Sequence, residues 1–192
     1  MAPGLGTKQK GLEMTAKVEQ RELVRKGRVF DVTVERVTLP NGSCVDMDII
    51  RHPGAAAIVA VDEENQVLML QQYRHAAGGT LWEIPAGTLE KHEDPADCAR
   101  RELVEETGCS AEHWTYLGMI VPVPGYSDEK IHIYLARDLK KAQQNLDPDE
   151  IIQVERLPLN RLMGMIAGGE INDAKTMAGL MLALPKLGHP LL

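Results

Sequence analysis

Short segments rich in β-branched and apolar residues alternate along the chain with polar segments that hold Pro, Gly, Asn or Asp. This is the pattern of strands joined by turns. Residues 28–39 alternate in character, residues 40–43 (Pro-Asn-Gly-Ser) carry a turn signal, and residues 44–52 return as a second strand, which together predict a hairpin. Further strands are predicted at 55–61, 66–73, 82–85, 114–122, 130–137 and 151–157.

Helical spacing of apolar residues predicts helices at 158–168 and 173–187. The second has a cap at Asn172 or Asp173, and Lys175 is expected at its surface.

The helix with the clearest end signals is predicted over residues 95–107. Asp94 suits the N-cap, Pro95 suits the first helical position, and Asp97 falls where a capping box places its acid. Gly108 is a natural residue to end the helix.

Three carboxylates share one side of this helix. At about 100° per residue, Glu102, Glu105 and Glu106 fall within one arc, and each pair repels by on the order of 2–3 kcal/mol at about 6 Å. Ala96, Ala99 and Leu103 form the adjoining apolar face. Arg101 can relieve part of the repulsion through Glu105, whereas a bound divalent cation would relieve far more. Clustered hard oxygens select Mg²⁺ or Mn²⁺.

A solvated acidic face is the ordinary interpretation of a glutamate-rich helix, but the spacing of residues around this helix favours a specific motif. Residues 87–109 read GTLEKHEDPADCARRELVEETGC, in which Gly87, Glu93 and the run Arg-Glu-Leu-Val-Glu-Glu-Thr-Gly stand at fixed intervals. Seven fixed matches arise by chance in roughly one window in 10⁸ at average residue usage. The stretch resembles the Nudix box, with Cys109 at a final position that is usually aliphatic.

The resemblance implies an α/β fold, the Nudix α/β/α sandwich with a mixed sheet, to which the N-terminal antiparallel β-ribbon is attached. It also implies a pyrophosphohydrolase that splits a nucleoside diphosphate linked to another moiety and uses Mg²⁺, for which Mn²⁺ substitutes. The implied metal ligands are the backbone carbonyl of Ala86 and the carboxylates of Glu102, Glu105 and Glu106. Glu93 and Arg101 are expected to brace the turn before the helix.

The flanking segments resemble the branch of ADP-ribose pyrophosphatases and nucleoside diphosphate sugar hydrolases. The similarity lies in residues 72–74 (Gln-Tyr-Arg), residues 83–87 (Glu-Ile-Pro-Ala-Gly) and Pro124. Arg74 is then a cation for the diphosphate, unless it pairs with a nearby acid. Glu83 bonds the base or ribose, unless it is only a strand-surface residue. The candidate substrate-binding residues are Arg28, Arg51, Arg74, Glu83, Ser127 and Glu129.

In that branch the N-terminal ribbon crosses to the partner subunit and helps to bind its substrate, which implies a homodimer with exchanged ribbons. The alternative interpretation of the ribbon is a hairpin without a role in binding.

The acidic loop at 138–150 supplies the candidate general base. A carboxylate that binds a metal accepts protons poorly, so the proton of the attacking water is expected to go to a carboxylate outside the helix. Glu150, next to the following strand, is the first choice, with Asp149 and Asp147 after it. Glu150 is also a candidate metal ligand, and Glu105 and Glu106 complete the candidate catalytic set.

Length and composition limit the remaining choices. The chain of 192 residues is expected to hold a leader at 1–27 that is flexible, the ribbon at 28–53, which mediates dimerisation, and one hydrolase domain at 54–192. A net charge of −7 argues against nucleic acid or anionic membrane as a partner. The cysteines (Cys44, Cys98 and Cys109) lack metal-ligand spacing, and neither a signal peptide nor a long apolar run is visible, so a reduced, cytoplasmic protein is expected.

The predicted function is Mg²⁺-dependent hydrolysis of ADP-ribose or a related nucleoside diphosphate sugar to a nucleoside monophosphate and a sugar phosphate. GDP-mannose, UDP-sugars or another dinucleotide are alternative substrates. Removal of mRNA caps or of oxidised nucleotides is a further alternative, and the lack of a basic surface disfavours the first of these. An alternative from another class of protein is a binding module that senses ADP-ribose without cleaving it. Loss of one of the Nudix-box glutamates would indicate such a module, and none of them is lost here.

Overall fold

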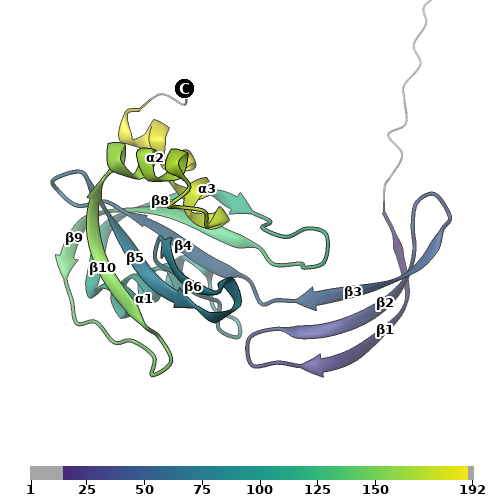
Figure 1. Ribbon diagram of the computed structural model, residues 1–192. Coiled ribbons are helices and arrows are strands. Elements are labelled where there is room, and N and C mark those ends of the chain that lie inside the picture. The colour runs from purple at the N-terminus through teal and green to yellow at the C-terminus, as the bar shows by residue number, and fades with distance from the viewer. Residues whose placement is uncertain (1–14, 190–192) are drawn as a thin grey trace, which may run out of the picture. The chain divides into compact units, whose positions relative to one another are not determined.

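The computed structural model describes residues 15–189 and divides into two compact units, Met1–Arg51 and His52–Leu192. Figure 1 labels the strands and helices of both units. Within the described residues, no helix is long and apolar enough to cross a membrane.

From residue 15 to Arg51, the N-terminal unit forms an antiparallel sheet of three strands in the order β1-β2-β3. Its strands are β1 Lys17–Lys26, β2 Asp31–Thr38 and β3 Cys44–Arg51. The predicted hairpin is confirmed as β2 and β3, and Gly42 adopts a positive φ of 84° in the turn between them.

The structure differs from the predicted leader at 1–27, because Lys17–Lys26 forms strand β1; residues 1–14 lie outside the described part. All ten residues of β1 are exposed, and polar pairs help to join the strand to β2. Arg21 Nε donates to Glu35 Oε1 at 2.5 Å, and Thr38 Oγ1 donates to Glu19 Oε1 at 3.0 Å. A strand without a buried face lacks the apolar alternation by which strands are recognised in a sequence.

The C-terminal unit, described as far as residue 189, contains two sheets there. One has the order β7-β4-β9-β8, in which β4 and β9 are parallel and the other neighbours antiparallel, and the second has the antiparallel order β10-β5-β6. The strands are β4 Ala55–Ala60, β5 Gln66–Arg74, β6 Gly79–Glu83, β7 Ala86–Thr88, β8 Cys109–Ile120, β9 Ile131–Lys141 and β10 Ile152–Pro158. The helices are α1 Pro95–Thr107, α2 Leu159–Gly168 and α3 Ala174–Ala183, with 3-10 helices η1 His75–Ala77 and η2 Leu184–Leu187.

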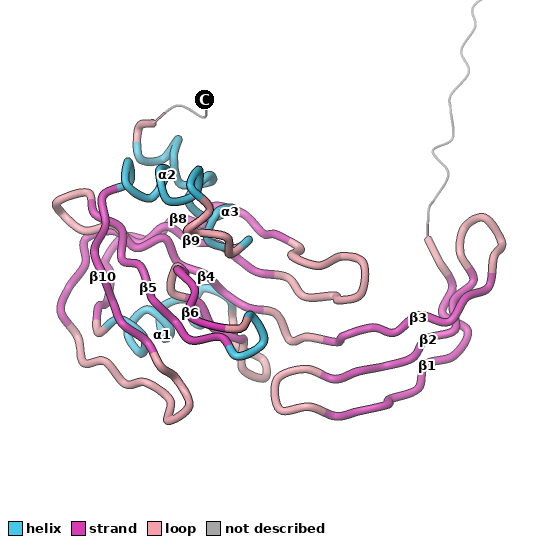
Figure 2. The backbone as a smooth tube through the Cα atoms, viewed as in Figure 1, coloured by secondary structure: helices cyan, strands magenta, loops and turns pink. Residues whose placement is uncertain are grey.

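Strand β4 lies between helices on both faces, which explains why all six of its residues are buried. Ala57 and Val59 belong to a core shared with α2, α3 and β6, whereas Ala56 and Ile58 belong to a second core formed with α1. Figure 2 shows α1 on one side of the strands and α2 and α3 on the other. The α/β/α arrangement with a mixed sheet confirms the predicted fold class.

Helix α1 has the predicted bounds. The Asp94 carboxylate accepts a hydrogen bond from the Ala96 N–H at 2.8 Å, Pro95 occupies the first turn, and Gly108 ends the helix with φ 64°. Cys98, Ala99 and Leu103 form its buried apolar face.

Several segments differ from their predicted bounds. Strand β8 begins at Cys109 instead of residue 114, and β9 continues to Lys141, so the acidic loop is shorter than predicted. Cys109 pairs with Lys141 and Ser110 with Lys140. These polar pairs extend the ladder without an apolar pattern that a sequence would reveal. The strand predicted at 82–85 is observed as β6, which begins earlier, at Gly79, and ends at Glu83; Ile84 and Pro85 separate it from β7.

Candidate active site

Helix α1 places its glutamates against the backbone of β7. Glu102 and Glu106 are buried, at 7% and 1% exposure, whereas the side chain of Glu105 is 35% exposed. The predicted arc of carboxylates therefore exists, and two of its members lie inside the protein.

The backbone of β7 is fitted to these two carboxylates. The Ala86 N–H donates to Glu106 Oε2 at 2.8 Å. A Cβ on Gly87 would lie only 1.8 Å from Glu102 Oε1, far inside a normal contact distance. Glycine is therefore required at position 87 for the Glu102 carboxylate to lie where it does.

Burial makes both carboxylates hard to ionise. It raises the pKa of Glu102 from 4.5 to about 7, against the opposing effect of Arg101, and the charges of Glu105 and Glu150 add to the rise. Burial also raises the pKa of Glu106 well above its usual value, and again the charge of Glu150 adds to it. The charge of Glu150 thus acts on both helix carboxylates, and its role as general base stays a prediction.

Arg101 joins α1 to the turn before it. Its Nε and Nη2 each donate to Glu93 at 2.9 Å, and its Nη1 donates to Glu102 at 2.6 Å and to Glu105 at 2.9 Å. The hydrogen bonds from Arg101 lower the pKa of Glu93 to about 2. This geometry agrees with the bracing role predicted for Glu93 and Arg101, including the contact with Glu105.

The oxygen donors around α1 fit a hard divalent cation in type and charge, since they are buried carboxylates that repel one another. Among residues 15–189, however, no group of three or more His, Cys, Asp or Glu side chains is arranged as the ligands of one ion. Arg101 holds Glu102 and Glu105, and the Ala86 amide holds Glu106. A cation would have to draw these carboxylates away from their present partners.

A second charged cluster brings together Arg74 and Glu83, two of the predicted substrate-binding residues. Arg74 donates to both Glu83 oxygens, at 2.9 and 2.8 Å. Burial alone would raise the pKa of Glu83, but Arg74 and Lys175 outweigh it and lower the pKa. The charge of Glu106 acts on Arg74 as well, which places this cluster beside the helix glutamates.

Lys175 corrects a prediction, because its side chain is only 13% exposed instead of lying at the surface. Its Nζ donates to Glu83 Oε2 at 2.5 Å and to Asp173 Oδ2 at 3.1 Å. Thr176, the next residue, accepts from the Ile84 N–H at 2.9 Å. The start of α3 is thereby fastened to β6, and Glu83 is a buried ion-pair partner instead of a strand-surface residue.

The other predicted site residues lie on loops or in the N-terminal unit. Glu150 is half-buried; its backbone N–H donates to the Asp147 carbonyl at 3.0 Å, and its Oε2 accepts from the Asp147 N–H at 2.9 Å. Ser127 is buried and its Oγ accepts from the Glu129 N–H at 3.1 Å. Arg28 is an exposed residue of the N-terminal unit.

Glu129 lies near a histidine, and Arg51 pairs with a glutamate. Glu129 Oε1 lies 3.8 Å from His52 Nδ1, and Arg51, in the N-terminal unit, forms an ion pair with the buried Glu35. A role in substrate binding stays a prediction for both.

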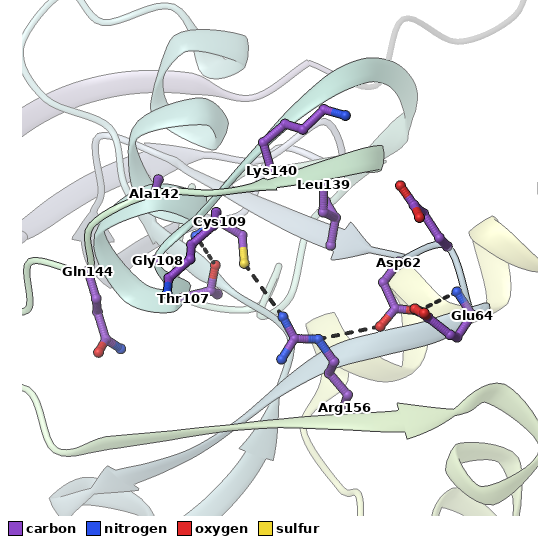
Figure 3. A pocket seen from close by; sticks show the side chains of 12 residues that line it. Asp62, Glu64, Thr107, Gly108, Cys109, Leu139, Lys140, Ala142, Gln144 and Arg156 are labelled. Atoms are coloured by element: carbon purple, nitrogen blue, oxygen red, sulfur yellow. Dashed lines mark hydrogen bonds and ion pairs between the residues drawn. The ribbon is translucent and has the colours of Figure 1, made fainter.

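A polar cavity of about 520 Å³ opens at the C-terminal end of α1. Figure 3 shows Arg156 between Asp62 and Cys109, at 3.4 Å from Asp62 Oδ2 and 3.9 Å from Cys109 Sγ. None of the predicted site residues is among the described residues that line it.

The layered fold, together with helix α1 and its buried glutamates, defines a Nudix domain. Residues 51–180 match the family model "NUDIX domain", and the chain belongs to this family.

Two relatives are similar over most of their length. A "Methanol dehydrogenase activator" of Bacillus methanolicus is 42% identical, over 86% of this chain and 89% of its own. An "ADP-ribose pyrophosphatase" of Bacillus subtilis (strain 168) is 40% identical, over 81% of this chain and 85% of its own. A solved structure, "Crystal structure of ADP compounds hydrolase", shares the fold with a TM-score of 0.78 at 24% identity, over 90% of this chain and 94% of that one.

Proposed function

We propose that this protein hydrolyses the diphosphate of ADP-ribose or of a related nucleoside diphosphate sugar, giving a nucleoside monophosphate and a sugar phosphate. The observation that carries the proposal is the pair of buried carboxylates, Glu102 and Glu106, packed against β7 beside the Arg74 cluster. The name and the 40% identity of the Bacillus subtilis relative support the choice of substrate.

Mg²⁺ is the proposed cofactor, with Mn²⁺ as a substitute. The residues that would hold it are the Ala86 carbonyl and the carboxylates of Glu102, Glu105 and Glu106, which leaves Glu150 free to accept a proton. When bound, it supplies neutralisation of the diphosphate and a more acidic attacking water. The ionised glutamates, which are costly in the metal-free protein, would then face a cation.

Glu150 is proposed as the general base. Water attacks one phosphorus, a new P–O bond forms as the bridging P–O bond breaks, and the proton of the water passes to Glu150. Support comes from the position of Glu150, whose charge acts on both Glu102 and Glu106 although it lies outside the helix. Glu105 and Glu106 complete the proposed catalytic set.

Arg74 and Glu83 are proposed to meet the substrate beside these carboxylates. The Arg74 side chain is 40% exposed while it pairs with Glu83, so it is accessible to a phosphate or ribose oxygen. Arg28, Arg51, Ser127 and Glu129 are proposed as further contacts.

A homodimer with exchanged ribbons is part of the proposal. In the described part of Met1–Arg51, the buried residues are Thr33, Glu35 and Val37. Leu23, Val24 and Phe30 are exposed by 54%, 58% and 43%. A thin sheet that exposes apolar side chains gains stability from a partner.

The direct test measures hydrolysis of ADP-ribose, GDP-mannose, UDP-glucose, NADH and diadenosine polyphosphates with and without Mg²⁺. ADP-ribose is expected to show the highest kcat/KM, with turnover lost in EDTA. Glu106→Gln should abolish turnover and keep the fold, whereas Glu63→Gln, in an exposed turn, should resemble the wild type. A preference for GDP-mannose would move the substrate to that alternative. Binding of ADP-ribose without turnover would indicate a sensor.

A further inference from the structure

The C-terminal end of an α-helix leaves carbonyl groups without partners inside the helix. In α1, two of these carbonyls and the carbonyl of the following residue, Gly108, accept hydrogen bonds from a single segment. The loop after β9 supplies three donors. The Ala142 N–H donates to the Gly108 carbonyl at 2.7 Å, and the Asn145 N–H donates to the Glu105 carbonyl at 3.0 Å. Gln144 Nε2 donates to the Glu106 carbonyl at 2.6 Å.

These bonds attach the loop to the residues that also form the candidate metal site. Glu105 and Glu106 present their carboxylates to that site and their carbonyls to the loop. The same loop carries Glu150, which is held in a turn by its two hydrogen bonds with Asp147. Movement of the loop on the helix end would therefore change the distance between Glu150 and the helix carboxylates.

The contact is also tightly packed. A Cβ on Gly108 would lie 3.2 Å from the Gln144 backbone nitrogen and 3.3 Å from its Cβ. Gln144 borders the polar cavity at this end of α1, so space is available for its side chain once its bond to Glu106 is broken (Figure 3).

We propose that Gln144 is a positioning residue for the hydrolysis, because it fastens the loop that carries Glu150 to the end of α1. The inference rests on the proposed function, in which Glu150 accepts the proton. Two of the three anchoring bonds use backbone N–H groups, whereas Gln144 uses its side chain, so a substitution can remove this bond alone. Gln144 itself does not touch the reacting atoms.

The test compares Gln144→Met with Gln143→Met. Both changes replace an exposed glutamine of one loop with a neutral side chain of similar length, but only Gln144 donates to the helix. Loss of this bond should lower kcat about tenfold for Gln144→Met while KM stays within about twofold. Gln143→Met should keep the wild-type kcat. Amide hydrogen exchange over residues 142–150 should be faster in Gln144→Met than in Gln143→Met.

A double substitution separates positioning from general stability. If Gln144 acts through Glu150, then adding Gln144→Met to Glu150→Gln should change the residual kcat by less than about twofold. A full tenfold further loss would overturn the proposal, as would equal kcat values for the two methionine variants. Equal rates of amide hydrogen exchange over residues 142–150 in the two methionine variants would show that Gln144 does not anchor the loop. A wild-type protein that hydrolysed none of the substrates would instead refute the proposed function, and the exchange comparison would still decide whether Gln144 anchors the loop.

Discussion

Replacing Glu102 with glutamine should stabilise the metal-free protein at alkaline pH and do so far less at acidic pH. Glu102 is 7% exposed as a residue, and its carboxylate lies against Gly87. Glutamine has nearly the same shape and keeps an oxygen that can accept from Arg101. The substitution therefore removes the charge while the packing is largely retained.

The direction of this pH dependence follows from the pKa of Glu102. Burial raises the pKa of Glu102 from 4.5 to about 7, so between these values the folded protein binds more protons at this group than the unfolded chain does. The contribution of Glu102 to stability is complete below pH 4.5 and is lost as the pH rises through about 7. At about 1.4 kcal/mol per pH unit, the full loss is on the order of 3 kcal/mol.

The assay is thermal unfolding in EDTA at about pH 5 and about pH 8, where the expected difference in stabilisation by Glu102→Gln is about 2 kcal/mol. For a chain of this length, that corresponds to about 4–8 °C in Tm. Comparing two pH values cancels any packing cost of the amide, because that cost does not depend on pH. Glu63→Gln serves as the control for loss of a carboxylate from the surface.

In millimolar Mg²⁺ at alkaline pH, the wild type should have a higher Tm than Glu102→Gln. The ion binds the ionised wild-type site and stabilises the folded protein by mass action. An equal effect of Glu102→Gln on Tm at both pH values would refute the reasoning. It would mean that Glu102 ionises as readily in the folded protein as in the unfolded chain.

Four further outcomes are expected. Arg101→Ala should lower the free energy of unfolding by on the order of 3 kcal/mol together with activity, because three carboxylates lose their partner; calorimetry that showed an unchanged Tm beside lost activity would contradict the bracing role. Glu150→Gln should lower kcat by about 10² or more with little change in KM, whereas Asp147→Asn should do much less, and steady-state kinetics decides between them. Gly87→Ala should displace the Glu102 carboxylate and weaken Mg²⁺ binding in titration calorimetry, so unchanged affinity would count against the steric argument. Light scattering should report a dimer, and a monomer at micromolar concentration would remove the exchanged ribbon from the proposal.

Helix α1 was predictable to the residue because its determinants are local. Asp94, Pro95 and Gly108 set its ends through contacts within a few positions, and the carboxylate arc follows from helical geometry alone. The strands with a buried face were predictable for the same reason, since their apolar residues alternate or run together. Strand β1 was not, because its pairing with β2 relies on polar groups and every residue of β1 is exposed.

The parts of the site that sequence reasoning missed depend on contacts between distant segments. Lys175 bonds Glu83, 92 residues earlier, and nothing near Lys175 in the sequence indicates that α3 begins against β6. Gly87 was recognised as part of a motif, but its physical reason, the Glu102 carboxylate directly over its Cα, requires the fold. The acidic loop was predicted at 138–150, but its first residues extend β9, and its attachment to the helix end was not visible in the sequence.

The parallel pairing of β4 with β9 has a consequence for synthesis of the chain on the ribosome. Strand β4 is a fully apolar segment, and its neighbour β7 follows soon after it in the chain, whereas Ala55 to Ala60 meet their other partner only at Ile131 to Ala136. Until β9 has been made, one edge of β4 has no partner and its apolar side chains have no complete cover. Such an exposed edge favours association between nascent chains. Truncated products that end before β9 are therefore expected to aggregate during expression, and slower elongation between these strands should lower the yield of native protein.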